Sequence, residues 1–129
     1  MAIDKANEIN ADLVIGTDPD ADRIGIAVRN DKGEMQIMNG NQTASMMTWY
    51  LLKEWKNQGK LTGKEFICQT IVTTNLMNDI ADAYEVDTEI TLTGFKWIAD
   101  VIRQNEGSRT FVGGGEESFG YMVGDFVRD

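Results

Sequence analysis

Short apolar runs separated by polar turns dominate the start of the chain, a pattern that is typical of strands. The runs at 12–16 and 24–29 predict two buried strands, and the turn residues at 30–33 lead into a partly exposed strand at 34–38. Polar and small residues at 5–10 indicate the last part of a helix that enters the first strand. The N-terminal part is therefore predicted to be a small β-meander.

Beyond Asn39 the apolar spacing becomes helical up to Gly59, and from there strands and helices alternate. In chain order, the later strands and helices are predicted at 66–72 (strand), 75–84 (helix), 87–92 (strand), 95–105 (helix) and 109–113 (strand). Strands that alternate with single helices imply right-handed crossovers and parallel pairing. We expect an α/β fold, with a mixed, mostly parallel sheet flanked by helices in residues 40–129 and a β-rich part in residues 1–39.

The same spacing predicts which side chains enter the core. The inward face of the helix at 75–84 is expected to consist of Leu76, Met77, Ile80, Ala81 and Tyr84. The single cysteine, Cys68, lies in an apolar run, where a small buried side chain is more common than a redox or catalytic thiol. We interpret Cys68 as structural.

Length and charge narrow the class of protein. A chain of 129 residues with 42% hydrophobic content can bury one core and an appended part. The net charge of -9 and 12 scattered basic residues argue against nucleic-acid binding, and no apolar run is long enough to cross a membrane. The protein is expected to be soluble and cytoplasmic. Histidine is absent, so proton transfer must rely on other side chains.

An acidic loop directly follows the first predicted strand. Asp18, Asp20 and Asp22 recur at every second position, so in an extended loop their carboxylates would face one side and repel one another. Hard oxygen ligands of this kind suit Mg²⁺ or Ca²⁺, although a solvated turn also favours aspartate. An EF-hand is excluded, because Arg23 and Arg29 stand where that loop needs glycine and glutamate. Arg23 is placed to bind a phosphate or to form a surface ion pair.

Two further loops follow predicted strands. The loop at 93–96 places Lys96 at the start of a helix, which suits a phosphate clamp or a general base, although a solvated lysine is the simpler interpretation. The loop at 113–118 joins a glycine run, suited to a ligand or to a tight turn, with the oxygen-bearing residues Glu116, Glu117 and Ser118. Since ligands of open α/β sheets bind beyond the carboxyl ends of strands, we expect all three loops at one sheet edge.

These three loops together resemble the α-D-phosphohexomutase superfamily. Residues 16–23 (GTDPDADR) are similar to its metal loop, residues 93–98 (TGFKWI) to its third-domain loop, and residues 115–121 (GEESFGY) to its sugar-binding loop, in the expected order. The resemblance covers essentially the whole chain. It implies that residues 1–39 end the second domain, and residues 40–129 form the third, of a four-domain phosphoglucomutase or phosphomannomutase.

The resemblance also implies a mechanism. An enzyme phosphoserine would exchange a phosphoryl group with a phosphosugar substrate through a bisphosphorylated sugar. The implied roles are Mg²⁺ binding by Asp18, Asp20 and Asp22, catalysis by Arg23 and Lys96, and substrate binding by Thr93, Gly94, Lys96, Glu116 and Ser118. Some members of the superfamily carry a histidine here, so in this chain proton transfer is left to Lys96 or Tyr121.

No segment of the chain resembles the superfamily's phosphoserine loop or its fourth-domain phosphate loop. We therefore expect the chain to be inactive alone and to work with the remaining domains of the same enzyme. Two alternatives stay open. A haloacid-dehalogenase-like phosphatase also places Asp-x-Asp after a buried strand, and a non-catalytic α/β module would bind a cation for stability or assembly.

Overall fold

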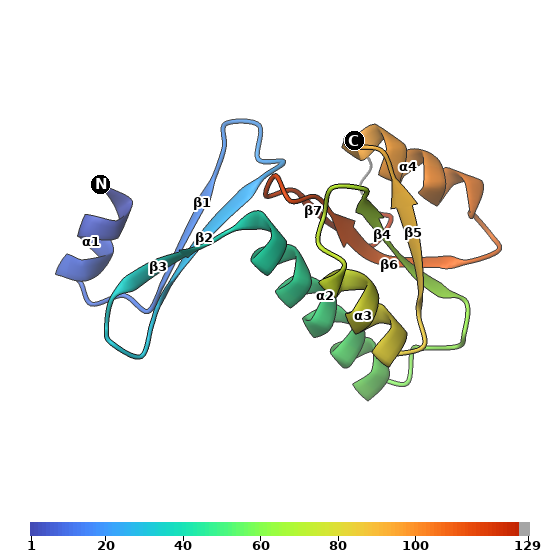
Figure 1. Cartoon of the computed structure of the whole chain (residues 1–129), viewed down its shortest axis with the longest axis horizontal. Helices are drawn as coiled ribbons and strands as arrows, with labels where there is room; N and C mark the ends of the chain where they lie inside the picture. Colours follow the sequence, from blue (N-terminus) through green and yellow to red (C-terminus); the bar gives the residue numbers. More distant parts are fainter. Residues whose placement is uncertain (127–129) are drawn as a thin grey trace.

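Two β-sheets, joined by one long helix, organise the chain in the computed structural model, which describes residues 1–126 (Figure 1). The first sheet has the strand order β1-β2-β3 and the second the order β5-β4-β6-β7. The elements in chain order are α1 (Ala2–Glu8), β1 (Leu13–Thr17), β2 (Ile24–Arg29), β3 (Met35–Met38), α2 (Gly40–Asn57), β4 (Glu65–Thr70), α3 (Leu76–Ala83), β5 (Asp87–Thr91), α4 (Phe95–Gln104), β6 (Thr110–Gly115) and β7 (Tyr121–Val123).

The first sheet is an antiparallel meander, as the sequence predicts. A hairpin loop at 18–23 joins β1 to β2, and Ile15 pairs with Ile26 across the two strands. A tight turn at 30–33 leads from β2 to β3. Arg29, the last residue of β2, donates from its guanidinium to the carbonyl oxygens of Gly33 in this turn and of Ala11 before β1. The meander then passes directly into α2, whose N-cap Asn39 accepts a hydrogen bond from the Gln42 N–H.

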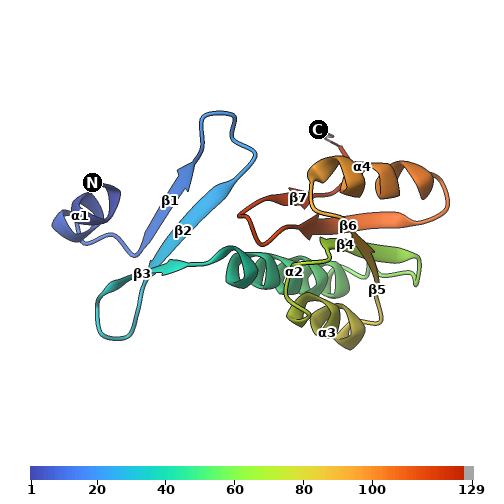
Figure 2. The same ribbon diagram turned by 45° about the horizontal axis from the view of Figure 1, so that its top comes forward.

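The second sheet is mixed and mostly parallel, so the predicted α/β class is confirmed. β4 pairs in parallel with β5 and β6, while β7 returns from a short turn and pairs antiparallel with β6. Helices α2 and α3 cover one face of this sheet and α4 covers the other (Figure 2). Strand β7 was not predicted, because only three residues form it. The carboxyl ends of β4, β5 and β6 meet at one edge.

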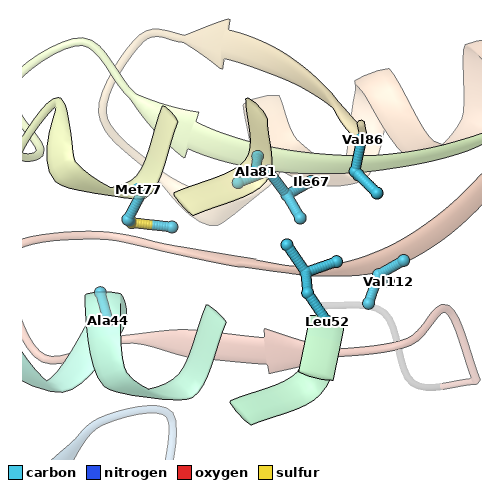
Figure 3. Packing of buried hydrophobic residues seen from close by; sticks show 7 residues of the cluster. All are labelled: Ala44, Leu52, Ile67, Met77, Ala81, Val86 and Val112. Carbon is cyan, nitrogen blue, oxygen red and sulfur yellow. The ribbon is translucent and has the colours of Figure 1, made fainter. Parts of the chain in front are cut away.

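Each face of the second sheet has its own hydrophobic core. Figure 3 shows the core under α2 and α3, in which Leu52, Ile67 and Met77 are fully buried. The core under α4 is built from Phe66, Cys68, Ile98, Ile102 and Phe111. Cys68 is thus a buried structural residue, as predicted, and burial raises the pKa of its thiol to about 12. The central strand β4 is buried on both sides and fixes the edge where the loops emerge.

Three details of the predicted elements are wrong. β1 was predicted to be a buried strand, but Leu13 and Ile15 are 49% and 58% exposed, because no other element of residues 1–126 covers them. Leu76 is 51% exposed, because it is the first residue of α3 and lines an open groove with Trp49 of α2, while the next residue, Met77, enters the core. Strand β4 ends at Thr70, two residues early, because the Thr73 N–H bonds the Thr70 carbonyl in a turn that leaves Ile71 and Val72 exposed. That turn adds a fourth loop to the carboxyl edge of the sheet.

Across residues 1–126, none of the helices combines the length and the apolar character that crossing a membrane requires.

Candidate functional site

The aspartates of the β1–β2 loop converge. Carboxylate oxygens of Asp18, Asp20 and Asp22 all lie within 4.8 Å of one another. The loop closes through a hydrogen bond from the Ala21 N–H to the Asp18 carbonyl, and Ala21 takes a left-handed backbone with φ 59°. This tight turn is what brings alternate side chains to one side. The prediction that the carboxylates gather is therefore supported by their geometry.

The charges of this cluster conflict. Partial burial raises the pKa of Asp22, and a shared hydrogen bond with Asp18 together with the charges of Asp20 and Asp18 raises it further. Burial acts on Asp18 in the same direction, but hydrogen bonds from the Arg23 N–H and from Asp22 outweigh it, so the pKa of Asp18 is lowered. A divalent cation would relieve this conflict, because it favours three ionised oxygens at once. The donor set therefore fits Mg²⁺.

Arg23 lies directly against the acidic cluster. Its backbone N–H donates to Asp18 Oδ1 at 3.2 Å, and its side-chain Nε lies 3.2 Å from Asp18 Oδ2 and 3.5 Å from Asp22 Oδ1. The Arg23 side chain is 56% exposed, so the N–H groups that do not face Asp18 and Asp22 are open to a ligand. The predicted ion pair of Arg23 is present, and phosphate binding by its guanidinium stays a prediction.

The other two predicted loops meet at the carboxyl edge of the second sheet. Glu116, at 7% exposure, accepts a hydrogen bond from the Gly94 N–H at 2.7 Å and another from the Ser118 hydroxyl at 2.8 Å. Gly94 caps α4 with φ 121°, a conformation that favours glycine. The Glu116 carboxylate thus joins the start of α4 to the turn after β6.

The aspartate loop reaches this edge from the other sheet. The expectation that all three loops follow strands of one sheet is wrong. β1 and β2 form a hairpin and therefore pair antiparallel in a sheet of their own. Contact is made through the backbone, by the Ile24 N–H that donates to the Phe119 carbonyl at 3.0 Å and by a β-bridge between Arg23 and Gly120. A cavity of about 240 Å³ lies beside this joint, lined by Thr17, Ala21, Asp22, Arg23, Ile24, Ile26, Met47 and Tyr121.

Two residues were considered for proton transfer, and their settings differ. Lys96 is exposed in the first turn of α4, with Nζ 5.1 Å from the centre of the Trp97 ring. The Tyr121 hydroxyl is bonded to Thr48 Oγ1 at 2.9 Å, and burial raises the pKa of this phenol. The Tyr121 hydroxyl is engaged inside the fold, whereas Lys96 is exposed, so Lys96 is the more accessible of the two to a substrate. Thr93, which precedes Gly94, is exposed.

The sequence did not indicate the loop after β4. Thr70 and Thr73 are buried there, and both hydroxyls donate to Glu117 Oε2. Glu117 had been grouped with Glu116, but the structure separates the two carboxylates. The repeated threonines in the segment TIVTT, directly after an apolar strand, are the signal that could have indicated this loop.

Comparison with known proteins agrees with this geometry. The fold and the candidate site define an α/β domain whose mostly parallel sheet has a tight acidic hairpin beside its carboxyl edge. Residues 39–129 match the family model described as phosphoglucomutase/phosphomannomutase, alpha/beta/alpha domain III, and the chain belongs to this family. The predicted resemblance to the superfamily is confirmed.

Among curated proteins, the chain is 40% identical to a phosphoglucomutase of Staphylococcus epidermidis and 38% identical to one of Staphylococcus aureus. All 129 residues are aligned, and they span 23% of the length of those relatives.

Solved structures share the fold. A phosphoglucomutase/phosphomannomutase family protein of Burkholderia thailandensis has a TM-score of 0.71 at 17% identity, with 94% of this chain and 23% of that chain covered. The N-acetylphosphoglucosamine mutase of Aspergillus fumigatus, in complex with GlcNAc-6P and magnesium, has a TM-score of 0.62 at 16% identity, with 96% and 27% covered.

Proposed function

We propose that the chain contributes the metal loop and the sugar-binding loop of a phosphohexomutase that interconverts sugar 1-phosphates and 6-phosphates. The observation that carries this proposal is the joint between the acidic hairpin and the turn after β6, made by the Ile24–Phe119 hydrogen bond. It supports the proposal because it brings the acidic hairpin against the turn that carries Glu116 and Ser118. Family membership and the phosphoglucomutase relatives support this function over a haloacid-dehalogenase-like phosphatase or a non-catalytic module.

In this proposal Asp18, Asp20 and Asp22 hold Mg²⁺. When bound, the ion would neutralise charge that develops on phosphoryl oxygens during transfer. Arg23, whose guanidinium is half-exposed beside the cluster, binds the same phosphoryl group and steadies it.

The sugar is bound by the second sheet. Glu116 and Ser118 receive its hydroxyls, since each oxygen of a carboxylate has acceptor capacity beyond its present bond. Thr93 and Gly94, in the loop before α4, also contact the substrate. Lys96, in the first turn of α4, binds the substrate phosphate or moves a proton at the sugar hydroxyl. The substrate and the donor phosphoserine then meet between the two sheets.

We further propose that the chain acts within a longer cytoplasmic enzyme, with residues 1–39 ending its second domain and residues 40–129 forming its third. The last three residues of that range lie outside the described part. The exposed apolar side chains of the first sheet support this proposal, because Leu13 and Ile15 share one face and are 49% and 58% exposed. Another layer would cover them. Alone, the 129 residues are expected to show no isomerisation of glucose 1-phosphate.

A hybrid enzyme tests the proposed function. Residues 1–129 would replace the matching segment of the Staphylococcus epidermidis phosphoglucomutase, to which they are 40% identical. We expect the hybrid to isomerise glucose 1-phosphate in the presence of Mg²⁺. An inactive but folded hybrid would contradict the proposal, as would turnover by the isolated 129 residues.

The metal assignment is tested in the same hybrid by Asp20→Asn. This substitution removes one ligand charge from an exposed loop, so we expect a loss of activity of roughly tenfold or more, with a melting temperature close to that of the parent. Asp31→Asn, in the exposed turn before β3, is the matched control and should keep full activity. Full activity of Asp20→Asn would rule out the metal site.

A further inference from the structure

Adjacent glutamates in the turn after β6 bind different loops. Glu116 Oε1 accepts from the Gly94 N–H in the loop after β5, whereas Glu117 Oε2 accepts from the hydroxyls of Thr70 and Thr73 in the loop after β4, at 3.2 and 3.3 Å. The turn is therefore tied to both of the other strand ends at the carboxyl edge.

The partners of Glu117 are buried hydroxyls. Thr70 is 0% and Thr73 5% exposed, and their hydroxyl oxygens lie 2.8 Å apart. The carboxylate receives a hydrogen bond from each of them. Each hydroxyl has one proton. Without Glu117 one hydroxyl could donate to the other, and the second proton would have no acceptor among the described residues. Glu117 thus determines how this pair of hydroxyls is oriented.

The backbone of Glu117, like its side chain, packs against another element. A Cβ added to Gly40 would lie 1.7 Å from the Glu117 carbonyl oxygen, so the turn rests directly on the first residue of α2. The next residue, Asn41, accepts a hydrogen bond from the Thr74 N–H at 2.9 Å. The start of α2, the loop after β4 and the turn after β6 therefore form one packed unit.

We propose that Glu117 is a positioning residue for the sugar-binding loop. By fixing the turn on Thr70 and Thr73, it keeps Glu116 and Ser118 in the arrangement that receives sugar hydroxyls. Glu117 itself contacts no substrate, because its carboxylate faces the loop after β4. The sugar-binding part of this inference rests on the proposed function, while the positioning part stands on the contacts of this chain alone.

Amide hydrogen exchange of the 129-residue chain, followed by NMR, tests the positioning. In Glu117→Ala we expect the Gly94 N–H to exchange roughly tenfold faster or more, while the amides of the β4–β6 ladder keep their protection. Glu117→Gln retains a carbonyl oxygen for the two hydroxyls and should restore slow exchange. Thr70→Val combined with Thr73→Val should reproduce the alanine variant.

Thr88→Val supplies the matched control, since the buried Thr88 hydroxyl on β5 has no hydrogen-bond partner among the described residues. It should leave the exchange of the Gly94 N–H unchanged. Unchanged exchange in Glu117→Ala would overturn the proposal. Equal loss of protection throughout the ladder would also overturn it, because Glu117 would then be a general stabilising residue.

The hybrid enzyme tests the sugar-binding part of the inference separately from the positioning part. Glu117→Ala is expected to lower kcat/KM for glucose 1-phosphate about tenfold with an unchanged Mg²⁺ dependence, and Glu117→Gln to recover most of it. A shifted Mg²⁺ dependence, or no recovery by glutamine, would contradict positioning of the sugar loop. If the hybrid with the parent chain is inactive, the proposed function fails, and the exchange experiment alone decides whether Glu117 positions Glu116.

Discussion

The roles of individual residues in this chain depend on their surroundings rather than on burial or residue type. Cys68 and Glu116 both carry reactive groups and are both buried, yet the thiol lies in a hydrophobic core and the carboxylate in a hydrogen-bonded loop. The apolar run around Cys68 was enough to predict its structural role. The different roles of Glu116 and Glu117 could not be predicted, because neighbouring glutamates look alike until their partners are known.

The burial of Cys68 leads to a direct chemical prediction. Its thiol has a pKa raised to about 12 and no exposed surface, so it should not react with DTNB in the native chain at neutral pH. Unfolding in guanidinium chloride should make it fully reactive. Rapid labelling of the folded protein would show that β4 opens far more often than its burial suggests.

At the level of elements, the ends of strands are less predictable than their existence. Every predicted strand is present, but β4 begins at Glu65 and ends at Thr70. Side-chain hydrogen bonds of Glu65 set its start and the turn from Thr70 to Thr73 sets its end, and no periodicity reveals either. At the first end, the Glu65 carboxylate accepts from the Thr62 hydroxyl and from the N–H groups of Thr62, Gly63 and Lys64. This carboxylate closes the turn that starts the central strand.

Glu65 should make stability depend on pH. Burial raises its pKa, but the hydrogen bonds from Thr62 and Gly63 outweigh burial and hold the pKa below the ordinary 4.5. A lowered folded pKa stabilises the protein fully above pH 4.5, and this stabilisation is lost as the pH falls through the folded pKa. Glu65→Gln should therefore lower the free energy of unfolding by about 2 kcal/mol at neutral pH and by less in acid.

Urea denaturation at neutral pH and well below pH 4.5 measures this difference. Glu34→Gln, in the exposed turn before β3, is the matched control and should change stability little at either pH. A Glu65→Gln deficit that stays constant between the two conditions would show that the charge of Glu65 is not responsible.

For the whole molecule, the sequence predicted the two structural parts but not how they meet. The change from strand spacing to alternating strands and helices near Asn39 coincides with the start of α2, and the α/β class followed from it. The joint between the sheets depends on backbone groups of Ile24 and Phe119, which are 95 positions apart and carry no sequence signal. The three motifs were therefore recognisable, but their assembly required the structure.

One face of the first sheet is exposed at β1 but buried at the neighbouring β2, which yields a prediction at the same scale. Ile15 is 58% exposed, whereas Ile26, its partner across the strands, is only 9% exposed. Ile15→Thr should reduce binding of the dye ANS by the native chain and change stability by less than about 0.5 kcal/mol. Ile26→Thr is the matched comparison and should cost about 2 kcal/mol. Equal costs in urea denaturation would mean that the Ile15 face is already covered.

The left-handed backbone of Phe119 affects how this chain can vary. Phe119 has φ 73°, and it is its carbonyl oxygen, not its ring, that accepts the hydrogen bond from Ile24. Glycine or asparagine can adopt this conformation more easily than phenylalanine, whereas valine or isoleucine would oppose it. The joint between the two sheets therefore tolerates different side chains at position 119, as long as they are not branched at the β-carbon. Homologous chains can keep the same site while this position looks unrelated.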